Sequence, residues 1–329
     1  MTDRLRSLLG AVGARVVPGT KAMRFLPVPG FSPNLDLPLI LVQGHRQGPV
    51  AIIIAGVHGG EYNGIEAARR VGVELDPASV NGAVAIVPLA NRAAFHARSH
   101  NGAPPDAQNL ARLVPGVAEG KALERVAHVL TTTLIQHGDL VLDIHGADAL
   151  EDLTPHLYVP PLASGYEARR WSGWDLAEVY GIELVELVGP EKLAGSAAHA
   201  GATLGIPSIL PEAGAFGHIN DRDMPLHYHG ILNVLRRVGI LDGAPTPVRN
   251  ARRVRHERVY SPATGCFYAS VRAGHVARRG EVLGEVKDYF GGNPMPITAP
   301  VDGEVDFIKY TLATNKGDSL FLIATEEGA

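Results

Sequence analysis

Strand-length runs of aliphatic residues alternate with helix-length amphipathic stretches through the first three-quarters of the chain, and this alternation constrains the fold most. Residues 37–42, 50–57 and 83–89 are rich in valine, isoleucine and leucine, whereas 122–138 has apolar residues at helical spacing and ends at a glycine. Near-continuous apolar strands separated by helices are typical of a sheet that is covered on both faces. We therefore predict an α/β domain with a mixed, mostly parallel sheet over residues 1–243.

The composition excludes several classes of protein. With 30 Lys and Arg against 34 Asp and Glu, the net charge of −4 gives no global basic surface for nucleic acid. No apolar run approaches the roughly 18 residues of a membrane helix. Cys266 is the one cysteine, which excludes an intrachain disulfide and a multi-cysteine metal site. The first residues lack the apolar region of a signal peptide, and together with the single cysteine this favours a cytoplasmic protein. From the charge balance and the short apolar runs we expect no nucleic-acid or membrane partners.

The composition changes after the α/β pattern. Residues 244–256 contain two prolines and a basic run, and we predict a linker there. From 257 to 329 the helical periodicity disappears, and short strands alternate with Gly and Pro. This pattern predicts a small, separate all-β domain at the C-terminal end.

The C-terminal segment contains an internal repeat. Residues 261–286 align with 299–324, and the alignment places Gly280 opposite Gly317. Two copies of one strand-and-turn pattern predict a pseudo-twofold β-domain, which resembles the biotinyl/lipoyl hammerhead fold. A swinging-arm carrier is disfavoured because Lys287, the nearest lysine, lacks the tight hairpin that carriers use. Such a module is more often structural or part of an oligomer interface. A homo-oligomer is therefore one possible assembly of this chain.

Polar side chains follow three of the predicted strands. The strand at 50–57 leads into His58 and Glu61, the strand at 140–144 leads into His145, and the strand at 206–210 leads into Glu212. Ligands of open α/β sheets bind at the carboxyl ends of the strands. We therefore expect these four side chains to meet at one edge of the sheet.

Two histidines and one carboxylate form the ligand set of a catalytic zinc site, in which the fourth position is left for water. His58, Glu61 and His145 provide such a set, which predicts one zinc ion per subunit, although His and carboxylate ligands also accept cobalt and manganese. Asp143 precedes His145 by two residues. This spacing suits a carboxylate that orients a histidine ligand or one that caps a turn, and both readings stay open.

Five segments together resemble one known family. His58-Gly-Gly-Glu61 resembles the HGxE signature of the succinylglutamate desuccinylase/aspartoacylase family, which belongs to the zinc carboxypeptidase-like superfamily. The other segments, in the family's order, are 88–98 (PLANRAAFHAR, like NPxAF…R), 106–116 (DAQNLARLVPG, like DGxNLNRxFPG), 143–146 (DIHG, like DxHG) and 211–214 (PEAG, like the late catalytic glutamate segment). The C-terminal segment also resembles the β-domain of the longer members. The resemblance extends from about residue 50 to the end.

The resemblance implies a role for the metal ligands and for Glu212. His58, Glu61 and His145 would bind zinc, which activates water and polarises a carbonyl. Glu212 would take the proton of this water and pass it to the leaving amine. A carboxylate that caps a turn is the competing reading of Glu212.

The resemblance also implies roles for three further polar residues. Arg98 falls where the family keeps an arginine that stabilises the oxyanion, although a surface arginine is the alternative. Asn109 and Arg112 would bind a carboxylate of the substrate. The family has a second asparagine where this chain has Ala111, so the substrate's acid-binding end differs.

Some pocket residues are predicted by position alone. His156 and Tyr158 follow the loop after the DIHG segment and are expected to form part of the pocket wall. His100 flanks the Arg98 segment and is expected to be solvated.

These observations favour a zinc-dependent deacylase that hydrolyses the amide bond of a small N-acyl amino acid or a related amine. A carboxypeptidase on the same scaffold is one alternative, and the β-domain argues against it because in this family the domain restricts the cleft. A non-catalytic binding protein is the other, and it is disfavoured because the three ligands and Glu212 are all retained. The acyl group and the amine are left unnamed by the sequence.

Overall fold

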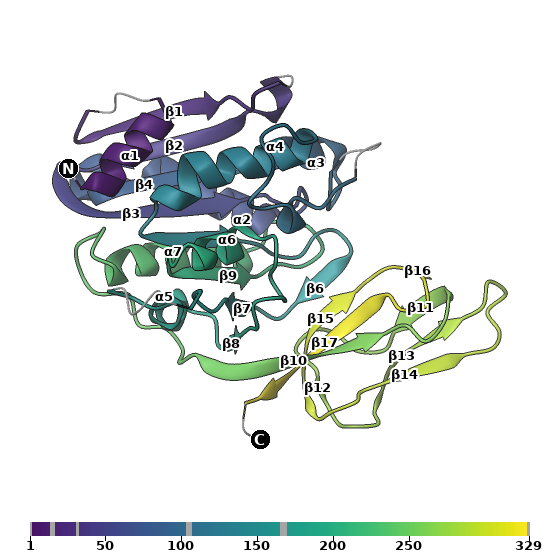
Figure 1. Ribbon diagram of the computed structural model, residues 1–329. Helices are drawn as coiled ribbons and strands as arrows, with labels where there is room; N and C mark the ends of the chain where they lie inside the picture. Colours follow the sequence, from purple (N-terminus) through teal and green to yellow (C-terminus); the bar gives the residue numbers. More distant parts are fainter. Residues whose placement is uncertain (1, 14–16, 31–32, 103–106, 165–169, 328–329) are drawn as a thin grey trace.

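A computed structural model describes the protein, with all residues placed except 1, 14–16, 31–32, 103–106, 165–169 and 328–329 (Figure 1). Its helices are α1 (Asp3–Ala11), α2 (Tyr62–Glu74), α3 (Arg92–Ala97), α4 (Ala122–Val129), α5 (Gly173–Tyr180), α6 (Ala197–Thr203) and α7 (Asp223–Arg237). The strands before the C-terminal module are β1 (Thr20–Leu26), β2 (Leu37–Gln43), β3 (Arg46–Ala55), β4 (Asn81–Val87), β5 (Leu140–Ile144), β6 (Glu151–Leu153), β7 (His156–Val159), β8 (Leu184–Leu187) and β9 (Ser208–Glu212).

The strands of the C-terminal module are β10 (Arg252–Tyr260), β11 (Gly265–Ala269), β12 (Val276–Ala277), β13 (Val282–Lys287), β14 (Met295–Thr298), β15 (Gly303–Lys309), β16 (Ala313–Thr314) and β17 (Ser319–Glu326). A large mixed sheet has the order β1-β2-β4-β3-β5-β9-β7-β8-β10-β17-β15-β12, and β6 pairs with β15. A smaller antiparallel sheet has the order β14-β13-β11-β16. The predicted α/β class and C-terminal β-module are therefore both confirmed.

The centre of the large sheet is parallel and buried on both faces. β3 pairs in parallel with β4 and β5, and β5 pairs in parallel with β9. Ile52 and Ile54 of β3 pack in one core cluster with α1, α4 and α6, whereas Ile53 packs in another with α2, α5 and α7. Successive strand residues point to opposite faces, so a strand between two helix layers must be apolar at every position.

The C-terminal module has the pseudo-twofold symmetry that its repeat predicts. β11, β12 and β13 correspond to β15, β16 and β17, and each copy gives its short middle strand to the other, because β12 pairs with β15 and β16 pairs with β11. The equivalent Gly280 and Gly317 have left-handed φ angles of 86° and 90°. Glycine occupies this region without the strain that a side chain would bring.

Strand pairing joins the α/β part to the C-terminal module. β10 begins at Arg252, inside the range 244–256 for which we predicted a linker, and it pairs in parallel with β8 and antiparallel with β17. A second connection forms where β6, which follows the α/β strand β5, pairs with β15. Figure 1 shows the C-terminal strands joined to the lower edge of the α/β layers. The large sheet therefore continues from one part into the other.

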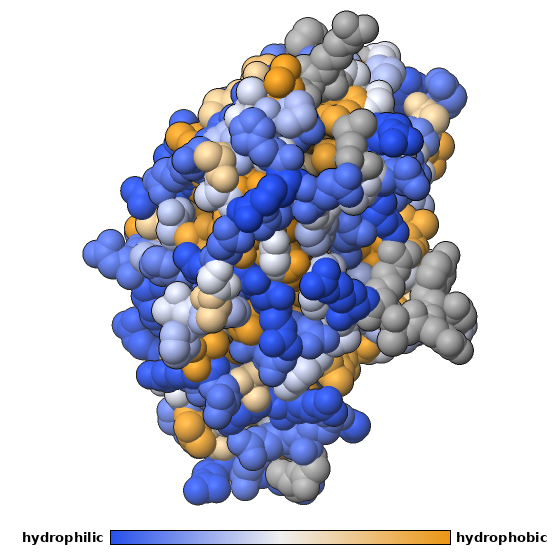
Figure 2. Space-filling view, turned by 90° about the vertical axis from the view of Figure 1, so that its left-hand side faces the viewer, coloured by the Kyte–Doolittle hydropathy of each residue, from blue (hydrophilic) through white to orange (hydrophobic). Residues whose placement is uncertain are grey.

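One face of the molecule is mostly polar (Figure 2). Figure 2 shows a face on which hydrophilic side chains dominate and apolar ones lie in small, separate groups. Within the described part of the chain, no helix is both long enough and apolar enough to cross a membrane.

Candidate functional site

Three strand ends bring the predicted side chains together. The loop after β3 carries His58 and Glu61 into the start of α2, β5 is followed directly by His145, and β9 ends at Glu212. The loop packs closely on α3, since a Cβ at Gly59 would lie 2.3 Å from the backbone carbon of Ala94. Only glycine permits this approach, which holds the loop beside the other strand ends.

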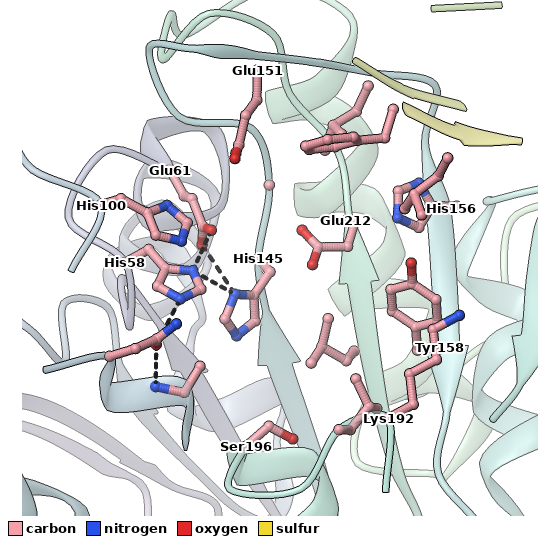
Figure 3. Close-up of a pocket in the computed structure, with 18 of the residues that line it drawn as sticks. His58, Glu61, His100, His145, Glu151, His156, Tyr158, Lys192, Ser196 and Glu212 are labelled. Carbon is pink, nitrogen blue, oxygen red and sulfur yellow. Dashed lines mark hydrogen bonds and ion pairs between the residues drawn. The ribbon is translucent and has the colours of Figure 1, made fainter. Parts of the chain in front are cut away.

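His58, Glu61 and His145 face a common point. The Nδ1 atom of His58 lies 2.6 Å from Glu61 Oε1, and the Nδ1 atom of His145 lies 3.2 Å from Glu61 Oε2. The two Nδ1 atoms are 3.3 Å apart. All three residues are buried (Figure 3). Two imidazole nitrogens and one carboxylate thus converge from two strand ends.

The second nitrogen of each imidazole faces an oxygen of a neighbouring residue. His58 Nε2 is 3.1 Å from Asn109 Oδ1, and His145 Nε2 is 3.2 Å from Asp143 Oδ1. Asp143 is itself held, because its Oδ2 accepts a hydrogen bond from the Ala198 backbone at 3.0 Å. An oxygen beside Nε2 favours the tautomer whose proton is on Nε2, which leaves Nδ1 free to bind a metal.

Asn109, which was predicted to bind a substrate carboxylate, lines the cavity and also contacts a histidine. Its side-chain oxygen lies beside His58 Nε2 and accepts the backbone N–H of Ala111 at 2.9 Å. The asparagine therefore ties a short helical turn to one imidazole. Asp143 lies beside His145 and also contacts the backbone of α6.

The buried groups fit a divalent cation. Glu61 Oε2 is buried and makes no hydrogen bond within the described structure. Burial alone would raise the pKa of Glu61, but the facing His58 and His145 lower it below its usual range. Burial opposes the charged form of His145, yet Glu61 and Asp143 raise its pKa well above the usual value. The site thus favours positive charge between these side chains, and its nitrogen and carboxylate donors suit zinc.

Glu212 lies on the other side of His145. It is partly buried, and Figure 3 shows its carboxylate pointing into the cavity between His145 and Tyr158. Burial raises its pKa well above the ordinary glutamate value; His145 opposes this rise, and the negative charges of Glu61 and Glu151 add to it. A carboxyl group whose pKa is raised in this way is suited to accept and return a proton near neutral pH.

His100 is not the solvated side chain that was expected. Its ring stacks on that of His58 with centroids 3.8 Å apart, and its Nδ1 lies 2.8 Å from Asp148 Oδ2. Burial would lower the pKa of His100, but Asp148 and Glu61 raise it. Its sequence context is polar and carries no signal for this contact, which depends on the loop after His145.

The two predicted arginines lie in different places. Arg98 ends α3 with a left-handed φ of 53°, is exposed, and is not among the residues that line the cavity. Arg112 does line the cavity, and its Nη1 donates to the backbone oxygens of Lys192 and Ala194, both at 3.3 Å. Asp106, the first residue of the DAQNLARLVPG segment, lies outside the described residues.

The cavity beside these groups has a volume of about 250 Å³. His156 and Tyr158 of β7 line it, as expected. One wall is a row of side chains that runs across four paired strands: Arg258 of β10 pairs with Leu322 of β17, Leu322 with Phe307 of β15, and Phe307 with Leu153 of β6. Sequence reasoning missed this wall, because pairing between β10, β17, β15 and β6 leaves no local signal.

Comparison with known proteins agrees with this geometry. Residues 47–238 match the family described as Succinylglutamate desuccinylase/Aspartoacylase catalytic domain. The chain is 28% identical over 298 residues to the N-alpha-acetyl-L-2,4-diaminobutyric acid deacetylase of Halomonas elongata, and the alignment covers 88% of this chain and 85% of the relative.

Two solved structures share the fold over nearly the whole chain. A succinylglutamate desuccinylase/aspartoacylase from Rhodobacter sphaeroides has a TM-score of 0.84 at 24% identity, covering 95% of this chain and 99% of its own. The product-bound ectoine utilization protein EutE (DoeB) from Ruegeria pomeroyi also has a TM-score of 0.84 at 24% identity, covering 94% and 98%. The family match spans more than half of the chain and includes every strand end that carries a site residue. The chain therefore belongs to the succinylglutamate desuccinylase/aspartoacylase family, whose enzymes are deacylases and desuccinylases that act on linear amide bonds.

Proposed function

We propose that this protein is a zinc-dependent deacylase that hydrolyses the amide bond of a small N-acyl amino acid or a related amine. One zinc ion per subunit would be held by His58, Glu61 and His145. The observation that carries the proposal is the convergence of these donors within 3.3 Å of one another, beside Glu212 and at the end of a small cavity.

A zinc ion at this position would act as a Lewis acid that polarises a carbonyl and lowers the pKa of bound water to about 7. The protein's own contribution is to hold the donors in place. Asp143 and Asn109 face the Nε2 atoms and keep both imidazoles turned toward the site. Outer contacts of this kind set both ligand orientation and ligand basicity.

Glu212 would move the proton. Its carboxylate faces the same end of the cavity as His145, and its raised pKa lets it take a proton from water and then deliver it to the amine that leaves. Because the proton is returned within one turnover, Glu212 serves first as a base and then as an acid.

Arg112 is the predicted partner of a substrate carboxylate, and it lines the cavity in which such a substrate would bind. No described carboxylate forms an ion pair with Arg112, and its fork is held in place only by two backbone oxygens. The oxyanion role of Arg98 stays a prediction. An Arg98→Gln variant tests it, because an oxyanion contact lowers kcat rather than raising KM.

The size of the cavity favours small substrates over peptides. Arg258, Phe307 and Leu322 of the C-terminal module form part of the cavity wall and limit the space beside the site. The Halomonas elongata relative is named for an N-acetylated diamino acid, which supports an acetyl group as the first acyl group to test. We therefore expect hydrolysis of N-acetyl amino acids and no release of residues from short peptides.

The test combines a Glu212→Gln variant with metal removal and return. We expect Glu212→Gln to keep its bound zinc and to lose roughly 10²- to 10⁴-fold in kcat, the usual contribution of a general acid–base group. Glu285→Gln, a change on β13 away from the cavity, is the matched control and should be neutral. Near-normal turnover of Glu212→Gln would remove Glu212 from the mechanism. Cleavage of peptides in place of N-acyl amino acids would support the carboxypeptidase alternative.

A further inference from the structure

The end of the cavity away from the metal ligands is built by both parts of the molecule. Tyr158 of β7 and Lys192 lie there, with the Lys192 ammonium 4.8 Å from the centre of the Tyr158 ring. Arg258 comes from β10 of the C-terminal module and also lines this cavity. We name Tyr158, Lys192 and Arg258 the distal subsite. Figure 3 shows Tyr158 and Lys192 across the cavity from His58.

Charge at the distal subsite is balanced except at Arg258. Lys192 forms an ion pair with Glu186, and His256 lies between Glu186 and Asp306, with its Nδ1 2.5 Å from Glu186. Although burial opposes it, the pKa of His256 is raised by these two carboxylates, which favours the positively charged imidazole. Lys192 and His256 thus both contact carboxylates. Among the described residues, no carboxylate pairs with Arg258.

The hydrogen-bond donors of the distal subsite have few acceptors within the protein. Arg258 Nη1 donates to Ser319 Oγ at 2.9 Å, which leaves the rest of its fork free. The Tyr158 hydroxyl makes no hydrogen bond within the described structure, and Figure 3 shows it pointing into the cavity. Burial raises the pKa of Tyr158 well above its usual value, so the hydroxyl keeps its proton and can donate a hydrogen bond. A guanidinium and a phenol with free donors are suited to a carboxylate.

We propose that Arg258, carried by the C-terminal module, binds the free carboxylate of the substrate in the distal subsite and so sets specificity for N-acyl amino acids over neutral N-acyl amines. This inference rests on the proposed function and extends it. Ala111 offers no amide to share a carboxylate with Arg112, and the distal subsite supplies donors from another strand instead. The apolar row of Leu322, Phe307 and Leu153 beside Arg258 would contact the aliphatic part of the same substrate.

The kinetic test compares an N-acetyl amino acid with its carboxamide, which lacks the negative charge. We expect Arg258→Gln to lose about 10- to 100-fold in kcat/KM for the acid, mostly through KM, which is the loss of a charge-assisted hydrogen bond. The carboxamide should change less than about twofold, and Arg258→Lys should recover part of the loss. Arg255→Gln is the matched control, because Arg255 lies on the same strand but pairs with Glu327 at the surface.

A binding test does not depend on turnover. In zinc-loaded Glu212→Gln protein, calorimetry should show tighter binding of the acid than of the carboxamide, and Arg258→Gln should abolish this preference. Turnover that is independent of Arg258, or a preference lost only in Arg112→Gln, overturns the inference while the proposed function stands. A carboxylate preference that depends on Arg258 without any turnover in the wild type supports the subsite and overturns the proposed function. Absence of binding of both ligands overturns the subsite.

Discussion

Two buried clusters in this molecule contain the same residue types, two histidines and one acid. The metal-end cluster is His58, His145 and Glu61, and the interdomain cluster is His156, His256 and Asp306. In the metal-end cluster the facing atoms lie 2.6 to 3.3 Å apart, and in the interdomain cluster one possible ligand atom of each residue lies within 4.8 Å of the others. Residue types and proximity alone therefore do not distinguish them.

The clusters differ in the contacts of one imidazole. In the metal-end cluster, both Nε2 atoms face an oxygen and both Nδ1 atoms face Glu61. In the interdomain cluster, His256 meets a carboxylate at each nitrogen, Glu186 at one and Asp306 at the other, as His145 meets Glu61 and Asp143.

His156, the other histidine of the interdomain cluster, contacts a backbone oxygen. The Nδ1 atom of His156 lies 3.0 Å from the backbone oxygen of Thr154. This nitrogen is therefore suited to carry a proton and donate a hydrogen bond, and not to bind a metal through a lone pair. Both imidazoles of the metal-end cluster thus present Nδ1 to Glu61, whereas the interdomain cluster is an ion-pair network that joins Glu186 of β8 to Asp306 of β15 through His256. The contacts around each donor decide the chemistry, and the residue list does not.

The largest effect should come from removing one histidine of the metal-end cluster. We expect His145→Gln to lose bound zinc on dialysis and with it all measurable hydrolysis, because one of three ligands is gone. The paired variant His256→Gln should keep its zinc. Metal analysis of both proteins makes the comparison, and zinc retained in His145→Gln would contradict the ligand assignment.

A large effect on stability is expected from the interdomain cluster. Asp306→Asn leaves His256 and Glu186 without their third partner, and the loss of one member of a buried ion network costs about 3–5 kcal/mol of unfolding free energy. Denaturant unfolding measures this cost, and Asp302→Asn, an exposed acid of the same module, is the control. A variant as stable as the wild type would show that the network does not stabilise the join.

An intermediate effect is expected from the residue that orients His145. Asp143→Asn removes the charge beside Nε2, and we expect zinc affinity to fall about 10- to 100-fold, as for other outer contacts of metal ligands. Competition with a chelator of known affinity gives the value. Unchanged affinity would assign Asp143 to its other contact, the backbone of α6.

The smallest effect concerns pH. Burial lowers the pKa of His156 to about 4 in the folded protein, whereas the unfolded value is about 6.5. Between these values the unfolded chain binds more protons, so His156 makes the protein less stable as the pH falls from 6.5 toward 4. From pH 6.5 to 5 this contribution is about 1–2 kcal/mol. In denaturant unfolding, His156→Gln should lose less unfolding free energy between pH 6.5 and pH 5 than the wild type does. A pH dependence equal to that of the wild type would exclude a neutral His156.

Much of the α/β part could be predicted because its signals are local. The strand at residues 140–144 appears as β5 with the predicted bounds, and the motifs at the strand ends meet because parallel strands share one edge. The offset of Gly280 and Gly317 likewise revealed the pseudo-twofold module.

The missed features depend on contacts between distant segments. Arg258 and Phe307 reach the cavity only because β10 and β15 pair with the strands beside them, and no local pattern encodes such pairing. His100 stacks on His58 for the same reason, across a loop that the sequence presents as polar. The contact between Asn109 and His58 was missed because a short motif does not show which way a side chain turns.

The shared strand β10 has a consequence for how the enzyme admits its substrate. Because β10 is hydrogen-bonded on one edge to β8 and on the other to β17, the wall that carries Arg258 is continuous with the catalytic sheet. A swing of that wall would break backbone hydrogen bonds between β8 and β10, so under the proposed function we expect substrates to be selected by their fit to a fixed wall.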